Sequence, residues 1–189
     1  MMKKRCLIGI AFAMCNIIFS QTIFINEIHY ENTGGDVNEG IEIAGPYSTD
    51  LTGYSVVLYN GSTSEVLKTE ALSGTIPNNE NYRGVLWFPI FPIQNDDEGI
   101  ALVDSDGNVL QFLSYEGVIT AADGPAMGLT STNISVAETD TTIIGFSLQL
   151  TGSGTEYSDF TWSSPILATM GNKNTGQLNK MFENQSPYS

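Results

Sequence analysis

The sequence is poor in the side chains on which most catalytic and metal centres depend. It has two cysteines, at positions 6 and 15, one histidine, His29, and seven Lys and Arg among 189 residues. Beyond residue 15 there is no thiol to form a disulfide, ligate zinc or act as a nucleophile. A single imidazole also leaves little material for a histidine-based catalytic or metal site. The chain further lacks an apolar run long enough to cross a membrane as a helix, and no window of 11 residues keeps a helical apolar period.

The first twenty residues have the pattern of a secretory signal. Positive charges occupy positions 3–5, the 13 residues 7–19 are mostly apolar, and Ser20 is a small residue at the expected cut. Thirteen residues are too few to span a bilayer. We therefore predict a signal peptide over 1–20, with cleavage after Ala13 or lipidation at Cys15 as alternatives. The prediction implies export, and with no anchor after the domain we expect a periplasmic, surface or released protein.

Removal of the signal leaves a strongly acidic chain. Four basic residues (Lys68, Arg83, Lys173 and Lys180) remain against 21 acidic ones, a formal net charge of −17. Nucleic-acid binding depends on clustered Lys and Arg that displace counterions from phosphates. The composition therefore argues against a nucleic-acid partner bound through a basic surface. It favours a soluble domain that tolerates salt and divalent cations.

Short β-prone segments separated by turn residues fill the rest of the chain. Apolar alternation, as in Phe146, Leu148 and Leu150, and Gly- or Asn-rich turns predict an all-β, two-sheet β-sandwich over residues 21–178, followed by a short polar tail at 179–189. The segment 100–103 is apolar on both faces and belongs in the middle of a sheet. Pro89 and Pro92 place their segment at an edge. The nine predicted strands cover 22–30, 40–44, 54–59, 66–72, 84–91, 99–103, 109–114, 142–150 and 160–163.

An ordered set of short motifs resembles the bacterial lamin-tail domain family. The motifs are 25–30 (INEIHY), 38–45 (NEGIEIAG), 50–54 (DLTGY), 99–104 (GIALVD), 112–117 (FLSYEG), 146–152 (FSLQLTG), 159–162 (DFTW) and 174–177 (NTGQ). They extend over nearly the whole chain beyond the signal. The resemblance implies an immunoglobulin-like sandwich and an exported, non-catalytic module, of a type found alone or ahead of extracellular nuclease domains. The sequence departs from the family pattern at 95–98, where a glycine turn is usual, and at 169–171, where Thr-Pro-Gly is usual.

Three enzyme classes can be weighed against the residues. A Ser-His-Asp hydrolase would need His29, which falls at the end of a predicted strand, and the chain has no Gly-x-Ser-x-Gly motif. We interpret His29 as a surface or strand-end residue. Paired carboxylates for glycoside hydrolysis are abundant, but no pair is distinguished by sequence. A metal-dependent nuclease would lack both a lysine near His29 and a positive docking surface.

Calcium is the most specific ligand that the sequence predicts. Ca²⁺ takes six to eight oxygen ligands from carboxylates, amides and backbone carbonyls. Two predicted loops, 31–39 and 95–98, are rich in such groups; the candidate ligands are Glu31, Asp36, Glu39, Asp96, Asp97 and Glu98. Solvated polar loops remain the alternative for both. The third acidic segment, 104–108, is interpreted as a hairpin turn.

Glu27 and Glu42 lie in or beside predicted strands, and we expect each to cap a loop by accepting hydrogen bonds from backbone N–H groups. Trp87 and Trp162 are expected to pack in the core or at its rim. The sequence thus predicts a non-catalytic binding or interaction module with a protein or glycan ligand. A secreted metal-dependent hydrolase or nuclease and a calcium-dependent carbohydrate-binding module are the alternatives.

Overall fold

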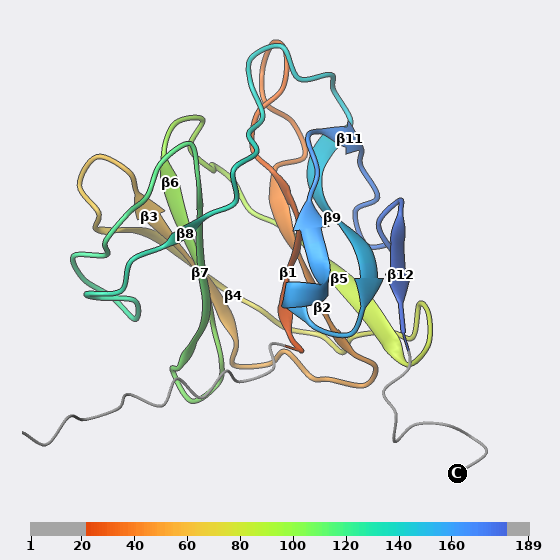
Figure 1. The fold of residues 1–189 in the computed structure, drawn as a ribbon. Helices are drawn as coiled ribbons and strands as arrows, with labels where there is room; N and C mark the ends of the chain where they lie inside the picture. The colour runs from red at the N-terminus through yellow and green to blue at the C-terminus, as the bar shows by residue number, and fades with distance from the viewer. Residues whose placement is uncertain (1–21, 181–189) are drawn as a thin grey trace, which may run out of the picture.

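A computed structural model describes residues 22–180, which form an all-β structure of two sheets packed face to face (Figure 1). The predicted signal peptide and residues 181–189 of the predicted tail lie outside the described residues. No helix among residues 22–180 is long and apolar enough to span a membrane.

The first sheet is built around β9 and β1. Its strand order is β10-β9-β1-β2-β5, and two short strands, β11 and β12, pair with β9. The pairings are antiparallel except that of β12 with β9. The strands are β1 (Phe24–His29), β2 (Gly40–Pro46), β5 (Arg83–Pro89), β9 (Phe146–Gly154), β10 (Phe160–Trp162), β11 (Ile166–Leu167) and β12 (Gln177–Asn179), with a 3-10 helix η1 (Tyr157–Asp159) before β10.

The second sheet has the order β4-β3-β6-β7-β8. Strand β8 runs parallel to β7, and the other pairs are antiparallel. Its strands are β3 (Ser55–Asn60), β4 (Val66–Ala71), β6 (Glu98–Val103), β7 (Val109–Tyr115) and β8 (Thr132–Asn133). Strand β6 is buried along its whole length in the middle of this sheet, as its apolar character on both faces predicts.

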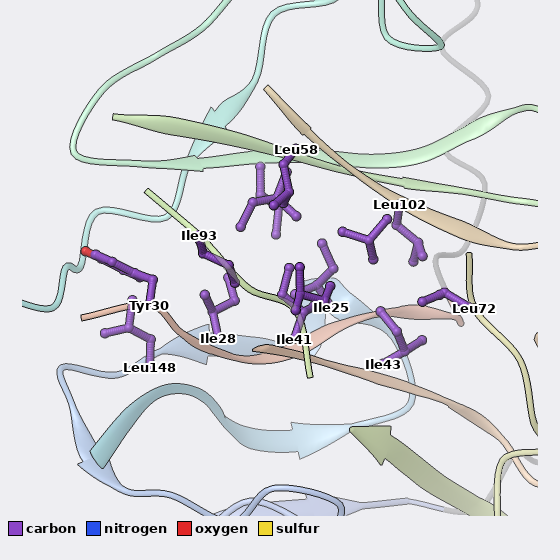
Figure 2. Packing of buried hydrophobic residues seen from close by; sticks show 14 of the residues in the cluster. Ile25, Ile28, Tyr30, Ile41, Ile43, Leu58, Leu72, Ile93, Leu102 and Leu148 are labelled. Carbon is purple, nitrogen blue, oxygen red and sulfur yellow. The ribbon is translucent and has the colours of Figure 1, made fainter. Parts of the chain in front are cut away.

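The main core fills the space between the sheets (Figure 2). Strand β1 directs its apolar side chains into the core and its polar side chains away from it. A β-bulge at Asn26 interrupts the register with β2, and Ile25, Ile28 and Tyr30 pack in the core on either side of it. Glu27 and His29 alternate with these core residues and bond to loops instead. The period-2 pattern of the strand, shifted by one at the bulge, therefore separates packing from polar contacts.

Each sheet is also covered on its outer face (Figure 1). The C-terminal segment 163–179 lies against the first sheet and reaches Glu27 and Glu42 through backbone hydrogen bonds. The loop 116–131 lies against the second sheet. An apolar cluster joins the two, with Val57, Tyr59, Ala101, Val103 and Phe112 on the strands and Ile119, Ala121 and Ala126 on the loop. Hydrogen bonds add to it: Ala126 N donates to Tyr59 Oη at 2.9 Å, and Val66 N of β4 donates to Asp123 Oδ1 at 2.7 Å.

All nine predicted strands are present, although the nine-residue run 142–150 begins as a strand only at Phe146. The short strands β8, β11 and β12 fall outside the predicted set. Strand β12 extends to Asn179, one residue into the predicted tail, because its backbone pairs with β9. Strand β5 is an edge strand, as predicted, but it ends at Pro89, two residues before the predicted end at 91.

Candidate functional site

Five glutamates are fully or almost fully buried, and each accepts a hydrogen bond from a backbone N–H group. They are Glu27, Glu39, Glu42, Glu98 and Glu138. A buried carboxylate is costly unless donors replace its lost hydration, and charge-assisted hydrogen bonds are the strong way to do so. These side chains form the polar framework of the molecule and are the first candidates for chemistry.

Glu27, in the middle of β1, is bonded on both oxygens. Its Oε1 accepts hydrogen bonds from Ser147 Oγ at 2.6 Å and Thr169 N at 3.0 Å, and its Oε2 accepts one from Thr169 Oγ1 at 2.7 Å. The carboxylate therefore ties the C-terminal segment to two central strands. The prediction that Glu27 caps a loop is confirmed.

Glu42, on β2, holds the same C-terminal segment two residues further along the chain. Its Oε2 accepts a hydrogen bond from Gly171 N at 2.6 Å and its Oε1 one from Asn26 Nδ2 at 2.9 Å. Gly171 has φ +81°, a left-handed conformation that favours glycine. Burial, with the nearby charge of Glu27, raises the pKa of Glu42 to about 8. The predicted capping role of Glu42 is confirmed, and burial makes its carboxyl group a weaker acid than usual.

Amides complete this network around the bulge at Asn26. Gln177 Nε2 donates to Asn26 Oδ1 at 2.6 Å, and Asn174 Nδ2 donates to the carbonyl oxygens of Asn26 and Leu150 at 2.9 and 3.1 Å. Asn174 Oδ1 in turn accepts from Thr169 Oγ1 at 3.0 Å. Asn174 and Gln177 therefore bond to Asn26, the residue that the bulge leaves outside the β1–β2 register.

A second polar cluster lies at the end of β1. His29 Nδ1 is 2.8 Å from Glu138 Oε1, and His29 Nε2 is 3.0 Å from the carbonyl oxygen of Val37. Both partners are acceptors, so both ring nitrogens donate when the ring is an imidazolium. Burial alone lowers the pKa of His29, but the hydrogen bond and charge of Glu138 outweigh it and raise the pKa above its usual value.

Glu138 also holds the chain that leaves β1. Its Oε2 accepts hydrogen bonds from Tyr30 N at 2.6 Å and Glu31 N at 2.9 Å. Its own backbone N–H donates to Tyr30 Oη at 2.7 Å. The side chain is therefore committed to three donors, and nothing in the sequence pattern distinguishes Glu138 as the partner of His29.

The histidine prediction is half wrong. His29 is the last residue of β1, as the strand-end reading requires, but it is fully buried instead of lying on the surface. The reason is the salt bridge with Glu138, 109 residues away in sequence, which compensates the cost of burial.

An aromatic stack continues this cluster into the second sheet. The rings of Tyr30 and Tyr115 are nearly parallel, with centroids 3.9 Å apart. Tyr30 Oη donates to Glu116 Oε1 at 3.0 Å, and Tyr115 Oη donates to the carbonyl oxygen of Gln94. The stack therefore connects the two sheets at this end and fixes the loop that precedes β6.

Glu39 and Glu98 hold adjacent residues of the same loop. Glu39 Oε2 accepts a hydrogen bond from Ile93 N at 2.5 Å, and Glu98 Oε2 accepts one from Gln94 N at 2.8 Å. Burial raises the pKa of Glu98 to about 8 and also raises the pKa of Glu39. These two predicted calcium ligands thus act as loop anchors in the structure.

The structure brings the two predicted calcium loops together. Asn95 Nδ2 donates to Asp36 Oδ2 at 3.0 Å, and Asp36 Oδ1 accepts from Asn32 N at 3.0 Å. Glu31 is half-buried, whereas Asp96 and Asp97 are exposed. Within residues 22–180, no three His, Cys, Asp or Glu side chains are grouped so as to hold a metal ion. Calcium binding stays a prediction.

The remaining candidates have structural roles. Asp104 Oδ1 accepts hydrogen bonds from Asp106 N and Asn108 N in the hairpin turn, as expected of a turn. Trp162 packs beside the core and donates from Nε1 to Tyr157 Oη at 3.0 Å. Trp87 packs on Gly40, where a Cβ would lie 2.5 Å from the ring. Both tryptophans are therefore packing residues: Trp162 lies at the rim of the core, and Trp87 is half-buried opposite Glu42 in the β2–β5 ladder, outside the core clusters.

The geometry as a whole joins strands to loops by buried carboxylates at two places: the outer face of the first sheet, and the end of the sandwich where β1 finishes. Comparison of the chain with family models, with curated proteins and with solved structures gave no match.

Proposed function

We propose that this protein is an exported, non-catalytic binding module of the lamin-tail type, with an immunoglobulin-like sandwich, that acts at the cell surface or outside the cell. The observation that supports the proposal is the use of five buried glutamates as loop anchors. A protein that binds through loops gains affinity when those loops are held in one conformation before the partner arrives.

The same residues are poorly placed for catalysis. A general base must reach the proton of a substrate, and His29 instead contacts Glu138 and the Val37 carbonyl group from a fully buried position. Glu27 and Glu138 each accept three hydrogen bonds from the protein itself. The carboxylates of Glu27 and Glu138 therefore serve to position the backbone.

A cleavage assay tests the proposal against the hydrolase and nuclease alternatives. Residues 21–189 are incubated with plasmid DNA and with chromogenic glycoside and ester substrates, in Mg²⁺, Mn²⁺ or Ca²⁺ and again in chelator. We expect no turnover above the protein-free control. Cation-dependent cleavage that disappears in a folded His29→Gln variant, but persists in the exposed-turn control Asp106→Asn, would overturn the non-catalytic assignment.

The calcium-dependent carbohydrate-binding alternative has its own test. The melting temperature is measured in excess Ca²⁺ and in chelator, and retention is measured on polysaccharide columns. Under the function proposed above, we expect the protein to pass unretarded through these columns. A ligand present at 100 times its Kd stabilises the folded state by about 2.7 kcal/mol. A calcium shift of that size, lost in Asp36→Asn, together with chelator-sensitive retention on a column, would establish that alternative instead.

Export is tested by expressing the whole chain in a bacterial host and sequencing the N-terminus of the exported protein. We expect the sequence to begin at Gln21. Protein retained in the cytoplasm with its first twenty residues intact would refute export, and a lipid-modified N-terminus at Cys15 would support the lipidation alternative.

A further inference from the structure

Three aliphatic side chains are exposed together where β9 begins. Ile143, Ile144 and Leu167 have exposed fractions of 59%, 56% and 69%. Leu167 is paired with Phe146 in the β9–β11 ladder, Ala168 N donates to the carbonyl oxygen of Gly145, and Phe146 N donates to that of Ile143. We call these three residues the apolar patch. Figure 1 shows β11 beside the start of β9 and close to the loop that precedes it.

The turn that carries the patch is held by hydrogen bonds. Thr142 N donates to the carbonyl oxygen of Thr139, and Thr139 N donates to Thr142 Oγ1, both at 2.8 Å. Thr33 N, from the loop after β1, donates to the carbonyl oxygen of Thr142 at 2.8 Å. Ile143 and Ile144 are therefore exposed on a turn whose backbone is held in place by hydrogen bonds. Exposed aliphatic groups on fixed backbone are typical of contact surfaces.

The surroundings of the patch carry charge of one sign. Carboxylates gather where the chain leaves β1: Glu138 Oε2 accepts from Glu31 N at 2.9 Å, Asp36 Oδ1 accepts from Asn32 N at 3.0 Å, and Glu116 Oε1 accepts from Tyr30 Oη at 3.0 Å. Asp140 precedes the patch residue Ile143 by three positions. Burial raises the pKa of Glu31, and the negative charges of these four residues raise it further. Residues 84–172, which include the patch, contain no Lys or Arg, and neither do residues 22–67. His29 is buried in its salt bridge with Glu138.

Three of the four basic residues beyond residue 20 are bonded to other parts of the chain; the fourth, Lys180, is the last described residue and follows β12. Lys173 Nζ donates to Glu80 Oε1 at 2.7 Å, and Lys68 Nζ donates to the carbonyl oxygen of Phe91 at 2.7 Å. Arg83 donates to the carbonyl oxygen of Thr22. The negative field at the patch is thus left for a partner to neutralise.

Resting on the binding function proposed above, we propose that the apolar patch and the acidic loops beside it dock a cationic polypeptide segment of a partner protein, whose apolar side chains cover Ile143, Ile144 and Leu167. Charge complementarity selects this occupant. A second copy of this chain, with a formal net charge of −17 beyond the signal, or a nucleic acid would be repelled. The patch is aliphatic and lacks the aromatic platform on which sugars stack.

The test measures fluorescence anisotropy of labelled peptides with residues 21–189 at 150 mM salt. The probe has four repeats of Lys-Leu-Gly; one control peptide has Lys-Ser-Gly, which keeps the charge without the apolar group, and another has Glu-Leu-Gly. We expect the first to bind at least 10-fold more tightly than either control. Ile144→Ser combined with Leu167→Ser should weaken binding about 10-fold, equivalent to 1.4 kcal/mol.

Matched variants distinguish the site from general attraction to an acidic protein. Val118→Ser combined with Met127→Ser alters two side chains that are equally exposed, at 62% and 68%, on the loop 116–131. This control should bind as the parent does, and Asp140→Asn should weaken binding and reduce its salt dependence. All variants are surface changes and should melt within a few degrees of the parent.

Equal losses in the patch and control variants, or no preference for the Lys-Leu-Gly peptide, would overturn the docking proposal. That result would leave the non-catalytic assignment standing, because the cleavage assay decides it separately. Conversely, catalytic turnover would refute the proposed function whatever the peptides show.

Discussion

The two sheets of this protein are both covered on their outer faces, but mainly by different kinds of contact. The C-terminal segment 163–179 is fixed to the first sheet by backbone N–H groups that donate to Glu27 and Glu42, and by its amide side chain Gln177, which donates to Asn26 of β1. The loop 116–131 is fixed to the second sheet by an apolar cluster that includes Tyr59 and Phe112. The same structural need, burial of an outer face, is thus met once through hydrogen bonds to buried carboxylates and once through an apolar cluster to which neutral hydrogen bonds such as that of Ser131 to Ser114 are added.

The difference has consequences for stability. Apolar burial is non-directional and roughly proportional to area, so it does not depend on the protonation of any side chain. A buried carboxylate bonded to several donors specifies one position of the covering segment, but its energy depends on geometry and pH. We therefore expect the two covers to respond differently to mutation and to titration.

The largest loss is expected from the apolar cover. Phe112→Ala removes a buried ring that lies edge-on to Tyr59, with centroids 5.2 Å apart. Replacement of a core phenylalanine by alanine costs about 4 kcal/mol in the free energy of unfolding. Denaturant titration measures the loss, and Phe112→Leu should recover more than half of it. A loss below 1 kcal/mol would mean that the loop packs only weakly on the sheet.

The next loss is expected from the polar cover. Glu27→Ala leaves the Ser147 hydroxyl and the Thr169 N–H without their acceptor, and leaves the Thr169 hydroxyl with Asn174 Oδ1 alone. Unsatisfied buried donors cost roughly 1–3 kcal/mol each, partly offset by water entry, so we expect a net loss of about 3 kcal/mol. Hydrogen exchange should rise around residues 163–177 and stay unchanged in 116–131. Equal exchange in both covers would contradict the separate roles assigned to them.

The pH dependence should separate the covers more clearly than mutation does. Burial raises the pKa of Glu42 to about 8, above its ordinary value of 4.5. Between these values the folded protein retains a proton that the unfolded chain has lost, so the free energy of unfolding falls as pH rises from about 4.5 to 8. Burial of Glu98 and the raised pKa of His29 act in the same direction.

Thermal melts between pH 5 and 8.5 measure this effect. We expect the melting temperature to fall with rising pH, and Glu42→Gln, whose amide mimics the neutral carboxyl group, to reduce the slope. Phe112→Leu should keep the parental slope because no titrating group is touched. A melting temperature that rises over this range would show that Glu42 is ionised in the fold.

The smallest expected effect concerns a hydroxyl at the apolar cover. Ser131 Oγ accepts a hydrogen bond from Ile119 N at 2.9 Å and donates one to Ser114 Oγ at 2.8 Å. Ser131→Ala should cost about 1 kcal/mol, the usual net value of a hydrogen bond. Urea titration against Thr130→Ala, an exposed neighbour, provides the comparison. A loss as large as that of Glu27→Ala would mean that this cover also depends on polar contacts.

Strand positions were predictable because alternation and turn residues are local signals. Segments such as 100–103, apolar on both faces, identified a central strand before any pairing was known, and β6 is that strand. Short strands such as β12 could not be predicted. Its polar residues Gln177 and Asn179 are buried because β9, Asn26, Glu80 and Asn81 supply hydrogen-bond partners from elsewhere in the chain.

The polar framework was predictable only in part. A glutamate inside an apolar strand requires donors, so the capping roles of Glu27 and Glu42 followed from residue type and place. The partners did not follow: Thr169 is 142 residues from Glu27, and Gly171 is 129 residues from Glu42. Glu138 lies in a segment without strand character and carries no local sign of its pairing with His29.

The sequence by itself determined the β-structure, the acidic character of the domain and the need for every strand glutamate to find donors, because these follow from residue types and their spacing. Only the tertiary structure decided which loops those glutamates hold, that His29 is buried as part of an ion pair, and that Ile143, Ile144 and Leu167 come together at an acidic end. Such contacts depend on the register of strands far apart in the chain, and register is set by the packing of the whole core.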